Sequence, residues 1–183
     1  MKANALTAAA ALIAIAWLSS FTANSDSRTD SPMQPSQDSV DLARVCVSES
    51  GFRDTNDCAA IGHLLVRRAE RLHITFAEMI RRYSTRAFDE QRTDRRRWIP
   101  FLSASLSEPR GWPVGLSWER YRDAWEARIG LARRVLSGAT ADPCPGSDHW
   151  GGAMDDHRVP DSWRRAVCAG VTLNRFWIVP RRR

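Results

Sequence analysis

Lysine is almost missing from this sequence. Lys2 is the single lysine among 27 cationic side chains, and all the others are arginine. The net charge of +6 and the pI of about 9.9 suggest a nucleic-acid-binding protein. A bias this one-sided is more typical of GC-rich coding than of a phosphate-binding surface, and no signature of a nucleic-acid-binding fold accompanies it. The charge alone therefore does not identify a partner, and we expect no specific nucleic acid.

Long apolar runs are also scarce, since the only one lies near the N-terminus, which excludes a polytopic membrane protein. Residues 1–23 have a short cationic start and an Ala-rich run, which predicts a signal peptide or a retained N-terminal anchor. Both remain open because Ala23 suits a cleavage site whereas Phe21 does not. Residues 24–38 are rich in Ser, Asp, Pro and Gln, which predicts a disordered linker. We expect one folded domain at 39–183, exported to the periplasm or cell envelope.

Four cysteines are few, but their even number matters in an exported chain. An oxidising compartment favours two disulfides. We favour Cys46–Cys58 and Cys144–Cys168 among the three pairings because each closes a short local loop. Zinc is the rival, but neither spacing matches a Cys-x-x-Cys pair.

The hydrophobic periodicity predicts a mainly α (α+β) domain with a small β or loop-rich C-terminal part. The stretches 84–97, 98–116 and 142–160 are expected to be irregular, and 167–179 is the most strand-like. Helices are expected from Asp38 or Ser39 to Ser50, from Asn56 or Asp57 through Leu72, from Thr75 with Phe76, Met79, Ile80 and Tyr83 inward, and from Ser117 to Gly138.

Glu49 is the sharpest chemical feature of the sequence. Its spacing from Leu42, Val45 and Cys46 places it on the apolar face of the first helix, at the C-terminal end. Desolvation and the negative end of the helix dipole both raise the pKa of a carboxyl in this position. A general acid that works near neutral pH needs such a shift. The alternative is an ordinary exposed glutamate at a helix end.

The segment Glu49-Ser50-Gly51-Phe52 resembles the catalytic motif of lysozyme-like lytic transglycosylases. A broader resemblance, to cell-wall hydrolases of the spore-cortex-lytic enzyme type, extends over about residues 42–178. Ser147 and Arg175 depart from that pattern. The segments that carry the broader resemblance are Leu42–Glu49, Ala59–Arg68, Ala132–Gly138, Asp142–Trp150 and Asn174–Trp177.

This resemblance implies a lysozyme-like domain that cleaves peptidoglycan glycan strands, with Glu49 as the single general acid/base and no cofactor. A lytic transglycosylase needs one carboxyl, whereas a hydrolase recruits a second. Asp54 and Asp57 are the nearest second carboxylates, although capping the second helix is the simpler role for either. The resemblance also implies substrate contacts by Tyr83, Ser84 and Asn174, with core packing as the alternative for Tyr83.

The tryptophans divide by their surroundings. Trp118 and Trp125 lie on the apolar face of a helix and are expected in the core. Trp112 and Trp150 lie in Gly/Pro-rich stretches, where we expect exposed indoles that stack on sugar rings. His149 and His157 on a glycine-rich stretch match no recognised metal geometry, so no metal is expected.

Two alternatives to a glycosidase are a cysteine amidase and a non-enzymatic binding protein. A papain-like amidase would need a free Cys58 beside a histidine, which paired cysteines would prevent. A non-enzymatic envelope protein that binds glycan or nucleic acid would use the runs Arg95–Arg97 and Arg181–Arg183. The favoured expectation is a monomeric peptidoglycan glycosidase.

Overall fold

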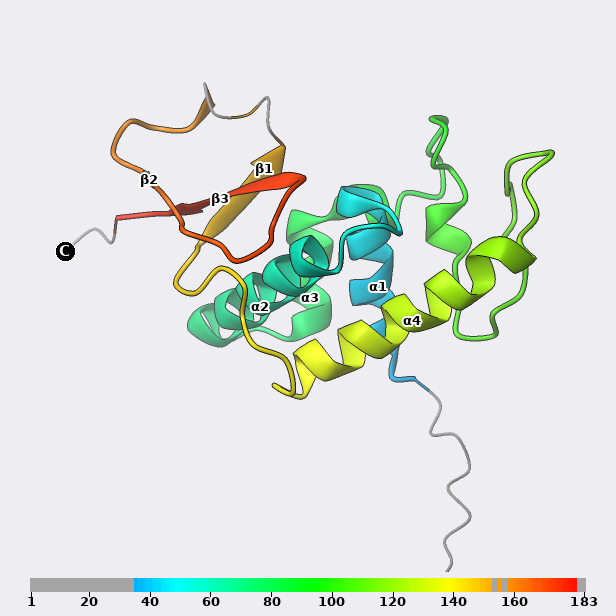
Figure 1. Cartoon of the computed structure of the whole chain (residues 1–183), viewed down its shortest axis with the longest axis horizontal. Helices are drawn as coiled ribbons and strands as arrows, with labels where there is room; N and C mark the ends of the chain where they lie inside the picture. Colours follow the sequence, from blue (N-terminus) through cyan, green and yellow to red (C-terminus); the bar gives the residue numbers. More distant parts are fainter. Residues whose placement is uncertain (1–34, 153–154, 156–157, 181–183) are drawn as a thin grey trace, which may run out of the picture. The chain divides into compact units, whose positions relative to one another are not determined.

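The computed structural model describes residues 35–152, 155 and 158–180 (Figure 1). The predicted leader at 1–23 and most of the predicted linker lie outside them. Within this part, four α-helices precede a small antiparallel sheet, as the mainly helical prediction requires. The α-helices are α1 (Gln37–Ser50), α2 (Thr55–Leu72), α3 (Phe76–Tyr83) and α4 (Glu119–Leu136), and the short 3-10 turns are η1 (Thr85–Ala87) and η2 (Ile99–Phe101).

The helix starts differ from the predictions by a few residues. The side chain of Ser36 accepts a hydrogen bond from the Ser39 backbone N–H, so α1 begins inside the predicted linker. Asp54, rather than Asn56 or Asp57, caps α2 in the same way. The N-cap residue of α4 is Trp118, without a side-chain cap, and not Ser117. The cap at Thr75 is confirmed.

Helix α1 forms the centre of the core and contacts α2, α3 and α4. Its buried side chains cover nearly every face of the helix. Gly62 allows α2 to approach closely, because a Cβ there would lie 2.8 Å from Val135 Cγ1 on α4 and 3.1 Å from Leu42 on α1. This packing fixes the direction in which α1 ends, and therefore where Glu49 lies.

A cluster of aromatic rings packs beside the helices. Trp112 contacts Trp98, Trp118 and Tyr121 with ring centroids about 5 Å apart. It is only 8% exposed, and its indole N–H donates to the carbonyl of Leu116. The expectation of an exposed Trp112 that stacks on a sugar is therefore wrong, because the loop folds the indole into the core.

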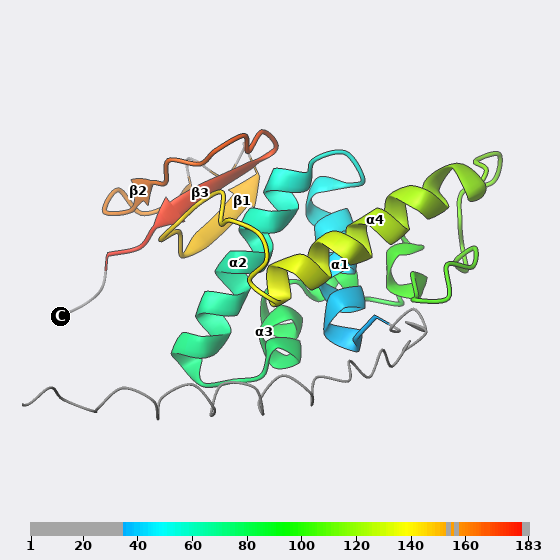
Figure 2. The ribbon, with the colours of Figure 1, turned by 60° about the horizontal axis from the view of Figure 1, so that its bottom comes forward.

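The sheet has the order β1-β3-β2, with β1 (His149–Gly152), β2 (Arg164–Arg165) and β3 (Asn174–Ile178). Strand β3 lies in the stretch predicted as strand-like, whereas β1 lies in a stretch predicted as loop. In the antiparallel β1–β3 pair, Trp150 is opposite the buried Phe176. Both views place the sheet beside α2 (Figure 1, Figure 2).

Two disulfides cross-link the fold, one between two helices and one between the segments that lead into the sheet. The Cys46–Cys58 disulfide joins α1 to α2, and the Cys144–Cys168 disulfide joins the segments that precede β1 and β3. Both predicted pairings are confirmed, and they indicate an oxidising environment. Among the described residues, no helix is long and apolar enough to cross a membrane.

Candidate functional site

Glu49 is the second-last residue of α1, and its side chain is partly exposed. Gly51, with a φ of 66°, ends the helix immediately after it. Burial raises the pKa of the Glu49 carboxyl above its ordinary value of 4.5. A hydrogen bond with the Trp150 side chain and the nearby positive charges of Arg86, Arg96 and Arg92 oppose this rise but do not cancel it.

Glu49 lines two cavities. One has a volume of about 250 Å³ and is lined by residues of α1, α2, α3 and β1 and by Asp155. The other has a volume of about 560 Å³ and is lined mainly by arginines. We call them the aromatic cavity (Glu49, Arg68, Tyr83, His149, Trp150, Gly151, Gly152 and Asp155) and the arginine cavity (Ser48, Glu49, Arg86, Arg92, Asp94, Arg95 and Arg96).

The turn after Glu49 is held by a buried arginine that the sequence reasoning missed. Arg128 of α4 is 3% exposed and donates to the carbonyls of Gly51 (3.1 Å) and Asp54 (2.9 Å). These are backbone groups of the link between α1 and α2, where helix ends leave carbonyls without partners. Arg128 therefore fixes the turn that positions the end of α1.

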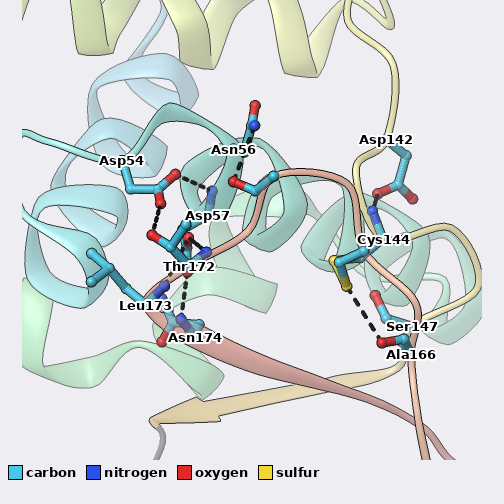
Figure 3. Close-up of a disulfide and its surroundings, with 12 residues drawn as sticks. Asp54, Asn56, Asp57, Asp142, Cys144, Ser147, Ala166, Thr172, Leu173 and Asn174 are labelled. Carbon is cyan, nitrogen blue, oxygen red and sulfur yellow. Dashed lines mark hydrogen bonds between the residues drawn. A yellow bond between two sulfur atoms is a disulfide. The ribbon is translucent and has the colours of Figure 1, made fainter.

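Trp150 reaches Glu49 because β1 is anchored through β3. The carboxylate of Asp57 accepts backbone N–H groups from Thr172 (2.9 Å), Leu173 (3.3 Å) and Asn174 (2.6 Å) at the start of β3 (Figure 3). Asp54 accepts from the Thr172 hydroxyl and also caps α2. Asp54 therefore has the capping role that the sequence favoured, whereas Asp57 anchors the start of β3 instead.

The pKa values of these two carboxyls move in opposite directions. Burial raises the pKa of Asp57, with its hydrogen bond to Asp54 acting in the same direction. Burial also acts to raise the pKa of Asp54, but hydrogen bonds from Thr172 and the capped backbone lower it overall. Neither Asp54 nor Asp57 lines the aromatic or the arginine cavity.

Arg68 and Tyr83 together form part of the wall of the aromatic cavity. The Arg68 guanidinium lies over the Tyr83 ring, 3.8 Å from its centroid. The Nε and Nη1 atoms of Arg68 are buried and have no hydrogen-bond partner among the described residues. Tyr83 is 41% exposed, so the expectation that it points into the core is wrong.

His149 completes this wall from β1. Burial lowers the pKa of its imidazole, and the positive charge of Arg68 adds to that effect. Its ring packs edge-on against Trp163, with centroids 4.9 Å apart. A neutral imidazole beside a cationic guanidinium gives this end of the cavity donors for a neutral or anionic ligand. No group of three or more His, Cys, Asp or Glu side chains within the described part of the chain is arranged to hold a metal ion.

The structure brings Glu49, Tyr83 and Trp150 together and leaves the other expected contacts elsewhere. Ser84 is 4% exposed with a buried hydroxyl, and Asn174 is 8% exposed at the start of β3. Neither lines the aromatic or the arginine cavity. The expectation that Ser84 and Asn174 contact the substrate therefore gains no support, because both side chains are buried.

Asp155 was missed as a second carboxylate in the aromatic cavity. Its Oδ2 accepts the backbone N–H of Gly152 (2.8 Å), and its Oδ1 lies 3.7 Å from the Arg158 guanidinium. Gly151 permits this approach, since a Cβ there would lie 2.8 Å from Asp155 Oδ2. The signal in the sequence is the pair Gly151-Gly152 shortly before an aspartate, within the stretch between His149 and His157.

Comparison with known protein families, curated proteins and solved structures gives no significant match for this chain. We therefore infer the function from the geometry around Glu49.

Proposed function

We propose that this chain is an exported glycosidase of the lytic transglycosylase kind, which cleaves peptidoglycan glycan strands with Glu49 as its general acid. The observation that carries the proposal is a single desolvated carboxyl that opens into two adjoining cavities. A carboxyl whose pKa is raised by burial keeps its proton nearer to neutral pH, as a general acid requires.

In the first step, Glu49 gives its proton to the oxygen of the glycosidic bond. The bond between that oxygen and the anomeric carbon breaks, and the departing sugar keeps the proton as a hydroxyl. Positive charge develops on the ring that stays behind. The Glu49 carboxylate, now ionised, stabilises that charge across the cavity.

In the second step, a hydroxyl of the same sugar attacks the anomeric carbon and returns its proton to Glu49. The product is a 1,6-anhydro sugar, no water is consumed, and one carboxyl serves both steps. The alternative is hydrolysis, in which a second carboxylate activates water. Asp155 and Asp94 are the carboxylates that line a cavity with Glu49. Asp155 Oδ2 accepts the Gly152 N–H and its Oδ1 lies 3.7 Å from Arg158, while Asp94 Oδ1 accepts a hydrogen bond from Arg92. This favours the anhydro route.

The aromatic cavity supplies surfaces suited to a sugar. The rings of Tyr83 and Trp150 offer apolar faces, while the Arg68 guanidinium has donors without partners among the described residues. A pyranose ring has an apolar face and a polar rim, so this combination of groups matches both.

The test is to incubate purified peptidoglycan sacculi with the full-length chain and analyse the soluble products by mass spectrometry. The proposal expects glycan fragments that end in 1,6-anhydro sugars. Reducing sugar ends would indicate hydrolysis instead. Release of peptides alone, or retention of the chain on intact sacculi without new glycan ends, would contradict the proposal and favour an amidase or a binding protein.

A further inference from the structure

The arginine cavity beside Glu49 carries more positive charge than the structure neutralises. Four arginines line it, against the two carboxylates of Glu49 and Asp94. Asp94 forms an ion pair with Arg92, with its Oδ1 2.6 Å from Arg92 Nε. This hydrogen bond is the main reason that the pKa of Asp94 is lowered to about 2.

Two of the arginines are built into the wall. Arg92 donates to the carbonyl of Arg86 (2.9 Å), and its side chain is only 8% exposed. Arg96 donates to the carbonyl of Ser48, the residue before Glu49. These bonds orient both guanidinium groups, and the neutral carbonyl leaves the charge of Arg96 uncompensated.

The other two arginines, Arg86 and Arg95, line the cavity with exposed side chains. Neither forms an ion pair with an acidic side chain among the described residues. Arg86 is close enough to Glu49 to lower the pKa of its carboxyl. A guanidinium presents a planar fork of donors that matches a carboxylate or a phosphate.

We infer that the arginine cavity is a subsite for an anionic group that the glycan strand carries next to the bond attacked by Glu49. This inference rests on the proposed function and adds a substrate class, namely an anionic polymer in preference to a neutral one. The volume of about 560 Å³ accommodates a carboxylate or phosphate together with part of the chain that bears it.

Binding is measured by co-sedimentation of the full-length Glu49→Gln chain with sacculi. Arg86→Gln/Arg95→Gln is added in the same background, with Arg120→Gln/Arg134→Gln as a control that removes equal charge from exposed positions on α4. The cavity variant is expected to bind about five- to tenfold more weakly, and the control less than twofold. Equal losses in both pairs would overturn the subsite.

Chemical treatment of the sacculi identifies the anion. Coupling of glycinamide to carboxyl groups neutralises the stem peptides, and hydrofluoric acid removes phosphate-linked polymers. Loss of the arginine-dependent binding after one treatment supports the subsite and names its ligand as a carboxylate or a phosphate. Binding that survives both treatments, or equal binding to neutral chitin, would overturn it.

A nucleic-acid phosphate is the remaining source of the anion. The same variants are tested against double-stranded DNA at physiological salt, where screened contacts weaken. Tighter, arginine-dependent binding to DNA than to sacculi would overturn the glycan subsite. Because the readout is binding, arginine-dependent binding without any glycan cleavage would refute only the proposed function, and cleavage without arginine dependence would refute only the subsite.

Discussion

The side chain of Trp150 on β1 is a hydrogen-bond partner of the Glu49 carboxyl at the end of α1. This bond favours the ionised carboxylate and so opposes the rise in pKa that burial produces. It makes the proton affinity of the candidate acid depend on the position of a strand from the far end of the chain.

Replacing Trp150 by phenylalanine removes the indole N–H and keeps an aromatic ring. The pKa of Glu49 is then expected to rise further, because a hydrogen bond that lowers it is lost. A general acid works in its protonated form, so the alkaline limb of the pH–rate profile should move to higher pH. Trp163→Phe, which removes an indole N–H outside the aromatic cavity, should leave that limb in place. A shift to lower pH in Trp150→Phe would contradict the account.

Asp155→Asn tests whether a second carboxylate takes part in the reaction. The anhydro route predicts a change in rate of less than about fivefold, because Glu49 alone exchanges the proton and Asp155 only holds the end of β1. The initial rate of glycan cleavage and the ratio of anhydro to reducing ends are measured together. A loss of about a hundredfold or more, with reducing ends in the wild-type products, would show hydrolysis.

Arg128→Ala removes the two hydrogen bonds that hold the turn after Glu49. The loss of a buried side chain and of partners for two carbonyls is expected to lower the free energy of unfolding by about 3 kcal/mol. Urea unfolding of the oxidised full-length chain measures this change. Arg120→Ala, at an exposed position of the same helix, should stay within about 0.5 kcal/mol of the wild type. Equal midpoints for the two variants would show that Arg128 does not support the turn.

Asp57→Ala leaves three backbone N–H groups at the start of β3 without their acceptor. We expect about 3 kcal/mol of destabilisation, together with faster amide hydrogen exchange at 172–174. The exposed Asp161 provides the control, since Asp161→Ala should alter neither quantity. Unchanged exchange at 172–174 in Asp57→Ala would mean that this carboxylate does not anchor the sheet.

The parts of the fold that depend on local sequence were predicted well. The cap at Thr75, the end of α1 before Gly51 and both disulfides follow from neighbouring residues and short loops. The burial of Trp112 was not predicted, because it depends on how an irregular stretch returns to the core and satisfies the indole N–H at Leu116.

The candidate site was only partly predictable for the same reason. The hydrophobic periodicity was enough to place Glu49 on the apolar face of α1, because the side chains on one face of a helix recur at a fixed spacing in the sequence. Arg68 and Asp155 enter the same cavity only when β1 pairs with β3, and no local pattern encodes that pairing. Because β1 was predicted as a loop, its pairing with β3 was not predicted either, and so the grouping of Arg68 and Asp155 in one cavity could not be foreseen.

The most direct test of the account is the initial rate of glycan-strand cleavage by Glu49→Gln, compared with wild type and with Glu126→Gln. Gln keeps the shape of the side chain but has no acidic proton to donate, and Glu126 is an exposed position on α4. The account predicts that Glu49→Gln is folded and at least a hundredfold slower, while Glu126→Gln matches the wild type. A folded Glu49→Gln that cleaves glycan strands at the wild-type rate would contradict it.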